Sequence, residues 1–392
     1  MAWFPRRFSR ISLAWRQLTY NKIRLVVAIT GITFAVILMF MQLAFLDSLY
    51  DSQTALHQRL QGDLVLFNSQ MKTLASTEEF PRQYLYRALN ISGVASINYL
   101  YHAQRPLKYG DTLGGKGAII IGINPENPAI AFPDAENLLP KINTIGTVLF
   151  DRNSDVKEYG NILTDLANQP YIKAEIAGRQ VRIVDTVDFA GASFADDGNI
   201  ITSVATFLKV SDRRADDITL GLVRLQPQAN AQAVLAAIKA QTPDLIQVMT
   251  IAEFIAYEKN YWSTSAPIGF VFGVGVFVGF LVGVVIVSQI LFNEVSEHLP
   301  DYALLKARGY RDRYFLKVLF QEASIIAILG YVPGFIAALG LYAVSRDATA
   351  LPIIMTTPRA IIVLGLTLTM CFTSGAIAMR KLKDADPAEL FS

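Results

Sequence analysis

The sequence is poor in the residue types that build catalytic and metal-binding centres. Its single cysteine, Cys371, excludes an internal disulfide and a zinc site made of several thiolates. Its three histidines, His57, His102 and His298, are too scattered along the chain to suggest a metal cluster. Residues 114–117 (Gly-Gly-Lys-Gly) lack the spacing and the Ser or Thr of a phosphate-binding P-loop and predict a glycine turn. The sequence therefore predicts a non-catalytic chain.

Charge is also scarce, because Asp, Glu, Lys and Arg make up only 17% of the 392 residues. The formal net charge of +2 excludes the strongly basic surface that a nucleic-acid-binding protein carries. Hydrophobic residues make up 52% of the chain and the mean hydropathy is +0.35, more apolar than an average soluble protein. These apolar residues gather in blocks, which indicates membrane helices joined to a more ordinary domain.

Four of these blocks are long enough to cross about 30 Å of hydrocarbon, which takes roughly 20 helical residues. They are residues 25–46, 267–292, 320–344 and 360–379. The first has no cleavage pattern after it, so we expect it to remain in the membrane rather than to be removed as a signal peptide. Within the four blocks the only charged residue is Glu322, which we expect to pair with Arg313 or Lys317.

Basic residues set the predicted orientation, since Lys and Arg near membrane helices favour the cytoplasmic side. They are concentrated in residues 1–24, 293–319 and 380–392, whereas the short link 345–359 has only Arg346 and Arg359. Both termini and the 293–319 loop are therefore predicted to be cytoplasmic. Residues 47–266 then lie outside the cytoplasm as one insert, with 19 Lys and Arg against 24 Asp and Glu, a net charge of −5.

The insert predicts an α+β domain, because apolar runs of strand length alternate with turn residues and helical patterns. The expected strands are residues 63–68, 94–101, 118–123, 181–187, 200–204 and 220–225, and the clearest helix is 229–241. A division into two subdomains near residue 170 is expected. The whole chain is thus predicted to be an α-helical membrane protein with four transmembrane helices and an α+β extracytoplasmic domain inserted between helices 1 and 2.

Helical spacing of apolar residues continues beyond the membrane on both sides of the insert. Leu49 and Leu56 extend the first span, and Phe254 and Tyr261 precede the second. Two such helices can pack together as a stalk that relays motion to the insert. The alternative is that they are simply the first and last helices of the inserted domain.

Three glycines in the second span, Gly275, Gly279 and Gly283, fall four residues apart and predict a smooth face for close helix packing. This face favours a homodimer contact, with packing inside the same subunit as the alternative.

The loop that follows the second span predicts a short capped helix, from Pro300 at its first position to Gly309 at its C-terminal end. A helix this short is marginal in water, so it is more credible when docked into a partner protein. The residues expected to make that contact are Glu297, Asp301, Tyr302, Leu304, Leu305, Lys306, Arg308 and Gly309.

From Ser296 this loop has the sequence Ser-Glu-His-Leu-Pro-Asp-Tyr-Ala-Leu-Leu-Lys-Ala-Arg-Gly-Tyr. It resembles the signature of MacB/FtsX-like ABC transporter permeases. Together with Phe320-Gln-Glu-Ala and Gly330-Tyr-Val-Pro-Gly it looks most like the DevC permeases of cyanobacterial heterocyst glycolipid exporters. The order of one span, a large domain and three spans is similar to that family along the whole chain. Arg308 departs from the pattern, which usually has an apolar residue there.

The resemblance implies a homodimeric permease in the bacterial inner membrane that binds two cytoplasmic ABC ATPase subunits through the 300–309 helix. ATP and Mg would then be bound by those partners, and this chain would hold no cofactor. The family further implies a periplasmic membrane-fusion protein, a TolC-like outer-membrane channel and export of an amphiphile such as a glycolipid. The alternatives are an FtsX-like signalling permease that controls a cell-wall hydrolase, and a lipoprotein-releasing permease.

Overall fold

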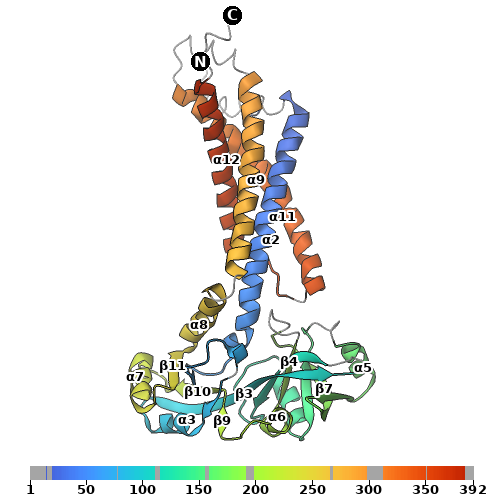
Figure 1. Ribbon diagram of the computed structural model, residues 1–392, viewed down its shortest axis with the longest axis vertical. Helices are drawn as coiled ribbons and strands as arrows, with labels where there is room; N and C mark the ends of the chain where they lie inside the picture. The colour runs from blue at the N-terminus through green and yellow to red at the C-terminus, as the bar shows by residue number, and fades with distance from the viewer. Residues whose placement is uncertain are drawn as a thin grey trace, which may run out of the picture. The chain divides into compact units, whose positions relative to one another are not determined.

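The computed structural model describes residues 15, 20–76, 78–110, 115–154, 159–190, 198–264, 268–297, 312–349 and 351–384. The chain divides into two compact units, shown in Figure 1. One is a helical unit made of residues up to 46, residues 269–345 and residues from 353 onward. The other is the inserted domain, made of residues 47–268 with residues 346–352.

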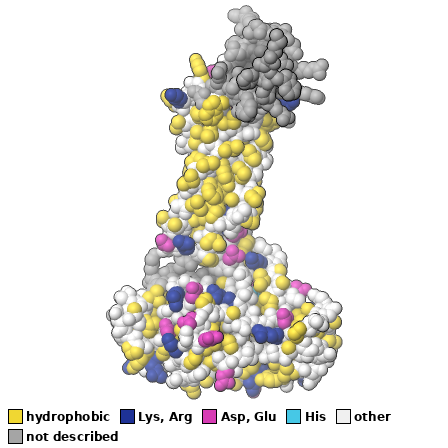
Figure 2. Space-filling model, turned by 180° about the vertical axis from the view of Figure 1, so that it is seen from behind, with side chains coloured by type: hydrophobic (Ala, Val, Ile, Leu, Met, Phe, Trp, Pro, Cys, Tyr) yellow, Lys and Arg dark blue, Asp and Glu magenta, His cyan; other side chains and the backbone are white. Residues whose placement is uncertain are grey.

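Four long helices carry the predicted spans: α2 (Lys22–Gln58), α9 (Ile268–Glu297), α11 (Asp312–Thr349) and α12 (Thr357–Asp384). All four are long and apolar enough to cross a membrane. Large apolar side chains point outward from the helical unit, and Phe270 and Ile336 expose 75% and 62% of their surface. Figure 2 shows apolar side chains covering the visible face of these helices, as a lipid environment requires. The predicted architecture of four apolar helices, with a domain between the first and the second, is confirmed.

Each helix is longer than the apolar stretch that predicted it. α2 continues twelve residues past residue 46, and α11 begins at Asp312 rather than at residue 320. Hydropathy marks only the part of a helix that lipid can cover, whereas polar turns beyond it still satisfy their own backbone hydrogen bonds.

The inserted domain is built on eleven described strands and several short helices. The strands are β1 (Leu64–Asn68), β2 (Phe80–Pro81), β3 (Val94–Lys108), β4 (Lys116–Ile123), β5 (Thr147–Asp151), β6 (Ile172–Ile176), β7 (Arg179–Val187), β8 (Asn199–Ser203), β9 (Asp217–Ile218), β10 (Leu220–Leu225) and β11 (Ile246–Thr250). The helices are α3 (Gln83–Arg87), α4 (Ala135–Leu138), α5 (Ile162–Asn168), α6 (Val204–Ser211), α7 (Ala231–Gln241) and α8 (Ile251–Thr264), with 3-10 turns η1 (Leu74–Ser76), η2 (Ala88–Asn90) and η3 (Leu139–Ile142).

Nine strands pair in the order β11-β1-β10-β3-β4-β8-β5-β7-β6, and β6 also pairs with β3, so that six strands close into a ring. The long strand β3 belongs to both parts: its first half pairs with β10 and its second half with β4. The division expected near residue 170 is not found. Strands β6 and β7, which follow it, pair with β5 and β3, which precede it.

The sheet separates two apolar cores. In β1 every residue is buried, and successive side chains point to opposite sides, as strand geometry requires. Leu64 and Leu66 lie in a core that includes residues of α3, α6 and α7. Val65 and Phe67 lie in a second core. The second core receives apolar residues from the outer end of α2 and from α8, so these two helix segments pack on the inserted domain.

Candidate functional site

The four predicted stalk residues lie on the segments of α2 and α8 that belong to the inserted domain. Leu56 and Phe254 are buried in its second core, and Leu49 is buried as well. Tyr261 is half-buried, with its ring 5.6 Å from that of Trp262. This arrangement matches the alternative in which the two segments are the first and last helices of the domain. Whether they also relay motion stays a prediction.

A buried carboxylate, Glu258 of α8, holds this part of α8 to its surroundings with four contacts. The Leu74 N–H donates to its Oε2 at 3.0 Å, and the Trp262 indole N–H donates to its Oε1 at 2.8 Å. The Thr73 hydroxyl donates to the same Oε1. The fourth contact joins it to α2, since His57 Nε2 lies 3.4 Å from Oε2, an ion-pair distance rather than a well-aligned hydrogen bond.

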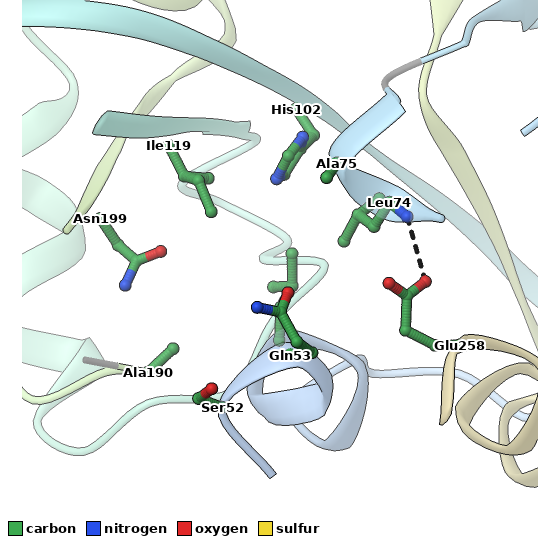
Figure 3. A pocket seen from close by; sticks show the side chains of 10 residues that line it. Ser52, Gln53, Leu74, Ala75, His102, Ile119, Ala190, Asn199 and Glu258 are labelled. Atoms are coloured by element: carbon green, nitrogen blue, oxygen red, sulfur yellow. Dashed lines mark hydrogen bonds between the residues drawn. The ribbon is translucent and has the colours of Figure 1, made fainter. Parts of the chain in front are cut away.

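Next to Glu258 lies a cavity of about 40 Å³, shown in Figure 3. Its lining combines polar groups of α2, α8 and the sheet with a few apolar side chains: Ser52, Gln53, Leu56, Leu74, Ala75, His102, Ile119, Ala190, Asn199 and Glu258. The volume suits one or two water molecules and is too small for an organic ligand. Among the described residues, no group of three His, Cys, Asp or Glu side chains could hold a metal ion.

Burial has opposite outcomes for the two titratable groups of this cavity. Burial alone would raise the pKa of the Glu258 carboxyl, but the contacts from His57, Thr73 and Trp262 together lower it below its ordinary value. Burial, together with the neighbouring His57 and Arg213, lowers the pKa of His102 to about 4, although Glu258 acts to raise it. Near neutral pH the cavity therefore holds an ionised Glu258 beside a neutral His102.

No sequence pattern indicated this cluster, because most of its members are far apart along the chain. Two of the three histidines, which are too scattered in the sequence to suggest a metal cluster, lie near the same carboxylate: His57 and His102. Only the packing of α2 and α8 on the sheet brings them together. The one local signal was the spacing of Glu258 and Trp262, four residues apart on one helix.

In the helical unit, the predicted glycine face of α9 is occupied by helices of the same chain. A Cβ atom on Gly275 would lie 2.4 Å from the Gln42 side chain of α2, and one on Gly283 would lie 1.9 Å from the sulfur of Met370 in α12. Gly279 lies against Leu38. The contacts agree with the alternative of packing inside the subunit. A homodimer contact would need another surface.

Two glycines of α11, Gly330 and Gly334, bring this helix close to α2 beside Pro333. A Cβ on Gly330 would lie 2.4 Å from Ile32, whereas one on Gly340 of the same helix would meet nothing within 4 Å. We expect Gly330→Leu to lower the thermal stability of the detergent-solubilised chain by about 1–3 kcal/mol, because overpacking forces the helices apart. Gly340→Leu is the matched control and should melt like the unmodified chain. Equal melting temperatures for the two variants would contradict the α2–α11 contact.

At the other end of α9, Glu297 has a partner within the chain, and its expected contact with an ATPase stays a prediction. Both of its oxygens accept from the guanidinium of Arg24 in α2, with Nη1 to Oε2 at 2.9 Å. The other residues predicted to contact an ATPase, residues 301–309, lie outside the described residues. Glu322 was expected to pair with Lys317 or Arg313. It is buried while Lys317 is exposed, and the side chain of Arg313 is outside the described set.

Comparison with known proteins gives a family match for the membrane part of the chain. Residues 268–387 match the family described as FtsX-like permease C-terminal. Two uncharacterized ABC transporter permeases from two strains of Mycobacterium tuberculosis are each 32% identical over 113 residues, which is 28% of this chain. The match covers 31% of the length of these relatives.

Solved structures similar to the chain include two extracytoplasmic domains. The periplasmic region of MacB from Actinobacillus actinomycetemcomitans is 12% identical with a TM-score of 0.36, and the alignment covers 52% of this chain and 94% of that one. The extracellular domain of the noncanonic ABC-type transporter YknZ from Gram-positive bacteria is 11% identical with a TM-score of 0.32, covering 48% of this chain and all of that one.

Proposed function

We propose that the chain is the permease subunit of an ABC exporter, in which cytoplasmic ATPases drive motion of the inserted domain. The observation that carries the proposal is the match of residues 268–387 to the FtsX-like permease C-terminal family. Two relatives of the same region are named ABC transporter permeases, which supports the same function. ATP and Mg then belong to the partner ATPases, and this chain supplies the membrane path for the motion.

The α2 helix is the element suited to carry that motion. It is one helix from Lys22 to Gln58, and its last turns are packed into the second core of the inserted domain through Leu56. A continuous helix transmits a displacement along its axis, because each turn is fixed to the next by backbone hydrogen bonds. In this proposal the motion of the ATPases reaches the chain at residues 300–309. It reaches the inserted domain through the last turns of α2 and through α8.

The remaining partners and the cargo follow from the resemblance of residues 296–334 to DevC permeases. We propose an inner-membrane homodimer that works with a membrane-fusion protein and a TolC-like channel, with an amphiphile, most simply a glycolipid, as cargo. The proposal is tested by purifying the chain from its native membrane in mild detergent. An ABC ATPase should copurify with it, and a membrane-fusion protein alongside the ATPase would favour export over control of a cell-wall hydrolase.

The proposed orientation has a direct test in single cysteines. In a Cys371→Ser background, Asn21→Cys places an exposed thiol just before the first membrane helix. Asp244→Cys places one in the inserted domain. We expect a membrane-impermeant maleimide to label Asp244→Cys in intact cells with a permeable outer membrane, and Asn21→Cys only after the inner membrane is opened. Labelling of both variants in intact cells would contradict the orientation derived from the basic residues.

A further inference from the structure

The cavity between α2, α8 and the sheet holds titratable groups that the proposed transport function does not use. His102 lies on β3, is 2% exposed, and has no hydrogen-bond partner for its Nδ1 among the described residues. Its backbone is fixed, since its N–H donates to the Thr219 hydroxyl at 2.9 Å. This bond holds the main chain of β3 in place beside the cavity.

We propose that this cluster is an acid-sensitive joint, in which proton uptake by His102 opens the contact between α2 and α8. The titratable and charged groups that face His102 come from three places in the fold: His57 of α2, Glu258 of α8, and Arg213, which follows α6. Arg213 is engaged by Glu79 at 3.1 Å. A proton on His102 thus adds a cation beside His57 and Arg213, with Glu258 as the remaining anion of the cavity.

Glu258 cannot neutralise that cation without giving up its present partners. Its two oxygens already accept from Thr73, Leu74 and Trp262 and face His57. A protonated His102 either takes Glu258 away from His57 or draws water into the cavity. Both outcomes weaken the contact between Glu258 of α8 and His57 of α2, which lies beside the Phe254 ring and the Asp51–Lys259 ion pair that also join the two helices. An unpaired buried charge is costly enough to drive such a rearrangement.

The pH range follows from the burial of His102. In the closed joint its pKa is lowered from 6.5 to about 4, whereas an open, hydrated joint restores the ordinary value. Between these pH values the open form binds a proton that the closed form does not. The open-to-closed ratio therefore rises up to about tenfold for each pH unit as the pH falls below 6.5, and levels off near pH 4.

Trp262 reports the state of this joint, because its indole N–H donates to Glu258. In the full chain in detergent, with Trp3 and Trp15 replaced by Phe, acrylamide quenching of Trp262 is measured from pH 7.5 to 4.5. We expect quenching to increase reversibly as the pH falls, with no loss of the far-ultraviolet circular dichroism signal. The measurement needs neither ATPase nor cargo, so its outcome is independent of the proposed transport function.

His102→Gln should remove most of this pH response, and His102→Phe serves if the first variant folds poorly. His298→Gln is the matched control, since it removes the one histidine outside the inserted domain, and it should respond like the parent chain. A parent chain whose quenching is flat between pH 7.5 and 4.5 overturns the proposal. A His102→Gln variant that keeps the full response overturns it as well.

Discussion

Replacing Glu258 by alanine is expected to destabilise the inserted domain by about 3–5 kcal/mol. The substitution leaves three donors and the His57 imidazole without their buried acceptor, and breaking a buried charge network from one side costs this much. The measurement is urea unfolding of the full chain in detergent, followed by Trp262 fluorescence in the background without the other two tryptophans.

Two controls separate the charge from the packing. Glu258→Gln keeps one acceptor oxygen, either for the Leu74 N–H or for the Thr73 and Trp262 donors, and should lose less stability than Glu258→Ala. Glu126→Ala removes an exposed carboxylate of the same domain and should stay within about 0.5 kcal/mol of the parent chain. If Glu258→Ala were no less stable than Glu126→Ala, the network around Glu258 would have no structural importance.

The second large effect is expected at the predicted coupling helix. Leu305→Asp should weaken ATPase binding by about 2–4 kcal/mol, roughly 30- to 1,000-fold, because interface energy concentrates in a few buried apolar anchors. Binding is measured by pull-down of the ATPase in detergent, together with stimulated ATP hydrolysis in nanodiscs. The variant should be expressed and folded normally, since residue 305 is predicted to face a partner rather than a core.

Lys306→Ala is the matched control on the same helix. An exposed charge at the edge of an interface contributes less than about 1 kcal/mol, so binding should weaken only modestly. Undiminished binding and stimulation with Leu305→Asp would move the ATPase surface away from residues 300–309. It would also remove the main sequence argument for a partner at this loop.

The membrane helices could be predicted from the sequence because each is a long apolar run, and length with hydropathy alone defines such a helix. Strands β1, β4, β8 and β10 were predicted for a similar reason, since they are short runs of apolar residues between turns. Strands β2, β5, β6, β9 and β11 were missed. The alternating pattern of β6, Ile-Lys-Ala-Glu-Ile, is only five residues long, and a pattern this short does not distinguish a strand from a loop.

The candidate site could not be predicted, because its contacts are non-local apart from the bond between Trp262 and Glu258 within α8. His57 and Glu258 are 201 positions apart, and Thr73 and Glu258 are 185 apart. No periodicity in either segment indicates that they meet. The pairing of Glu297 with Arg24 was missed for the same reason: the loop motif suggested a partner protein, whereas in the described part of the chain Glu297 accepts from Arg24 of α2.

The second core of the inserted domain also decides where this domain can be cut free as a soluble fragment. Leu56 and Leu60 at one border and Phe254 at the other are buried with Val65 and Phe67 of β1. A fragment trimmed to residues 61–250 would leave one face of its central strand without a covering layer, and such an apolar face promotes aggregation. Crystallisation or binding work on the isolated domain should therefore use residues 47–264, which retain the last turns of α2 and the whole of α8.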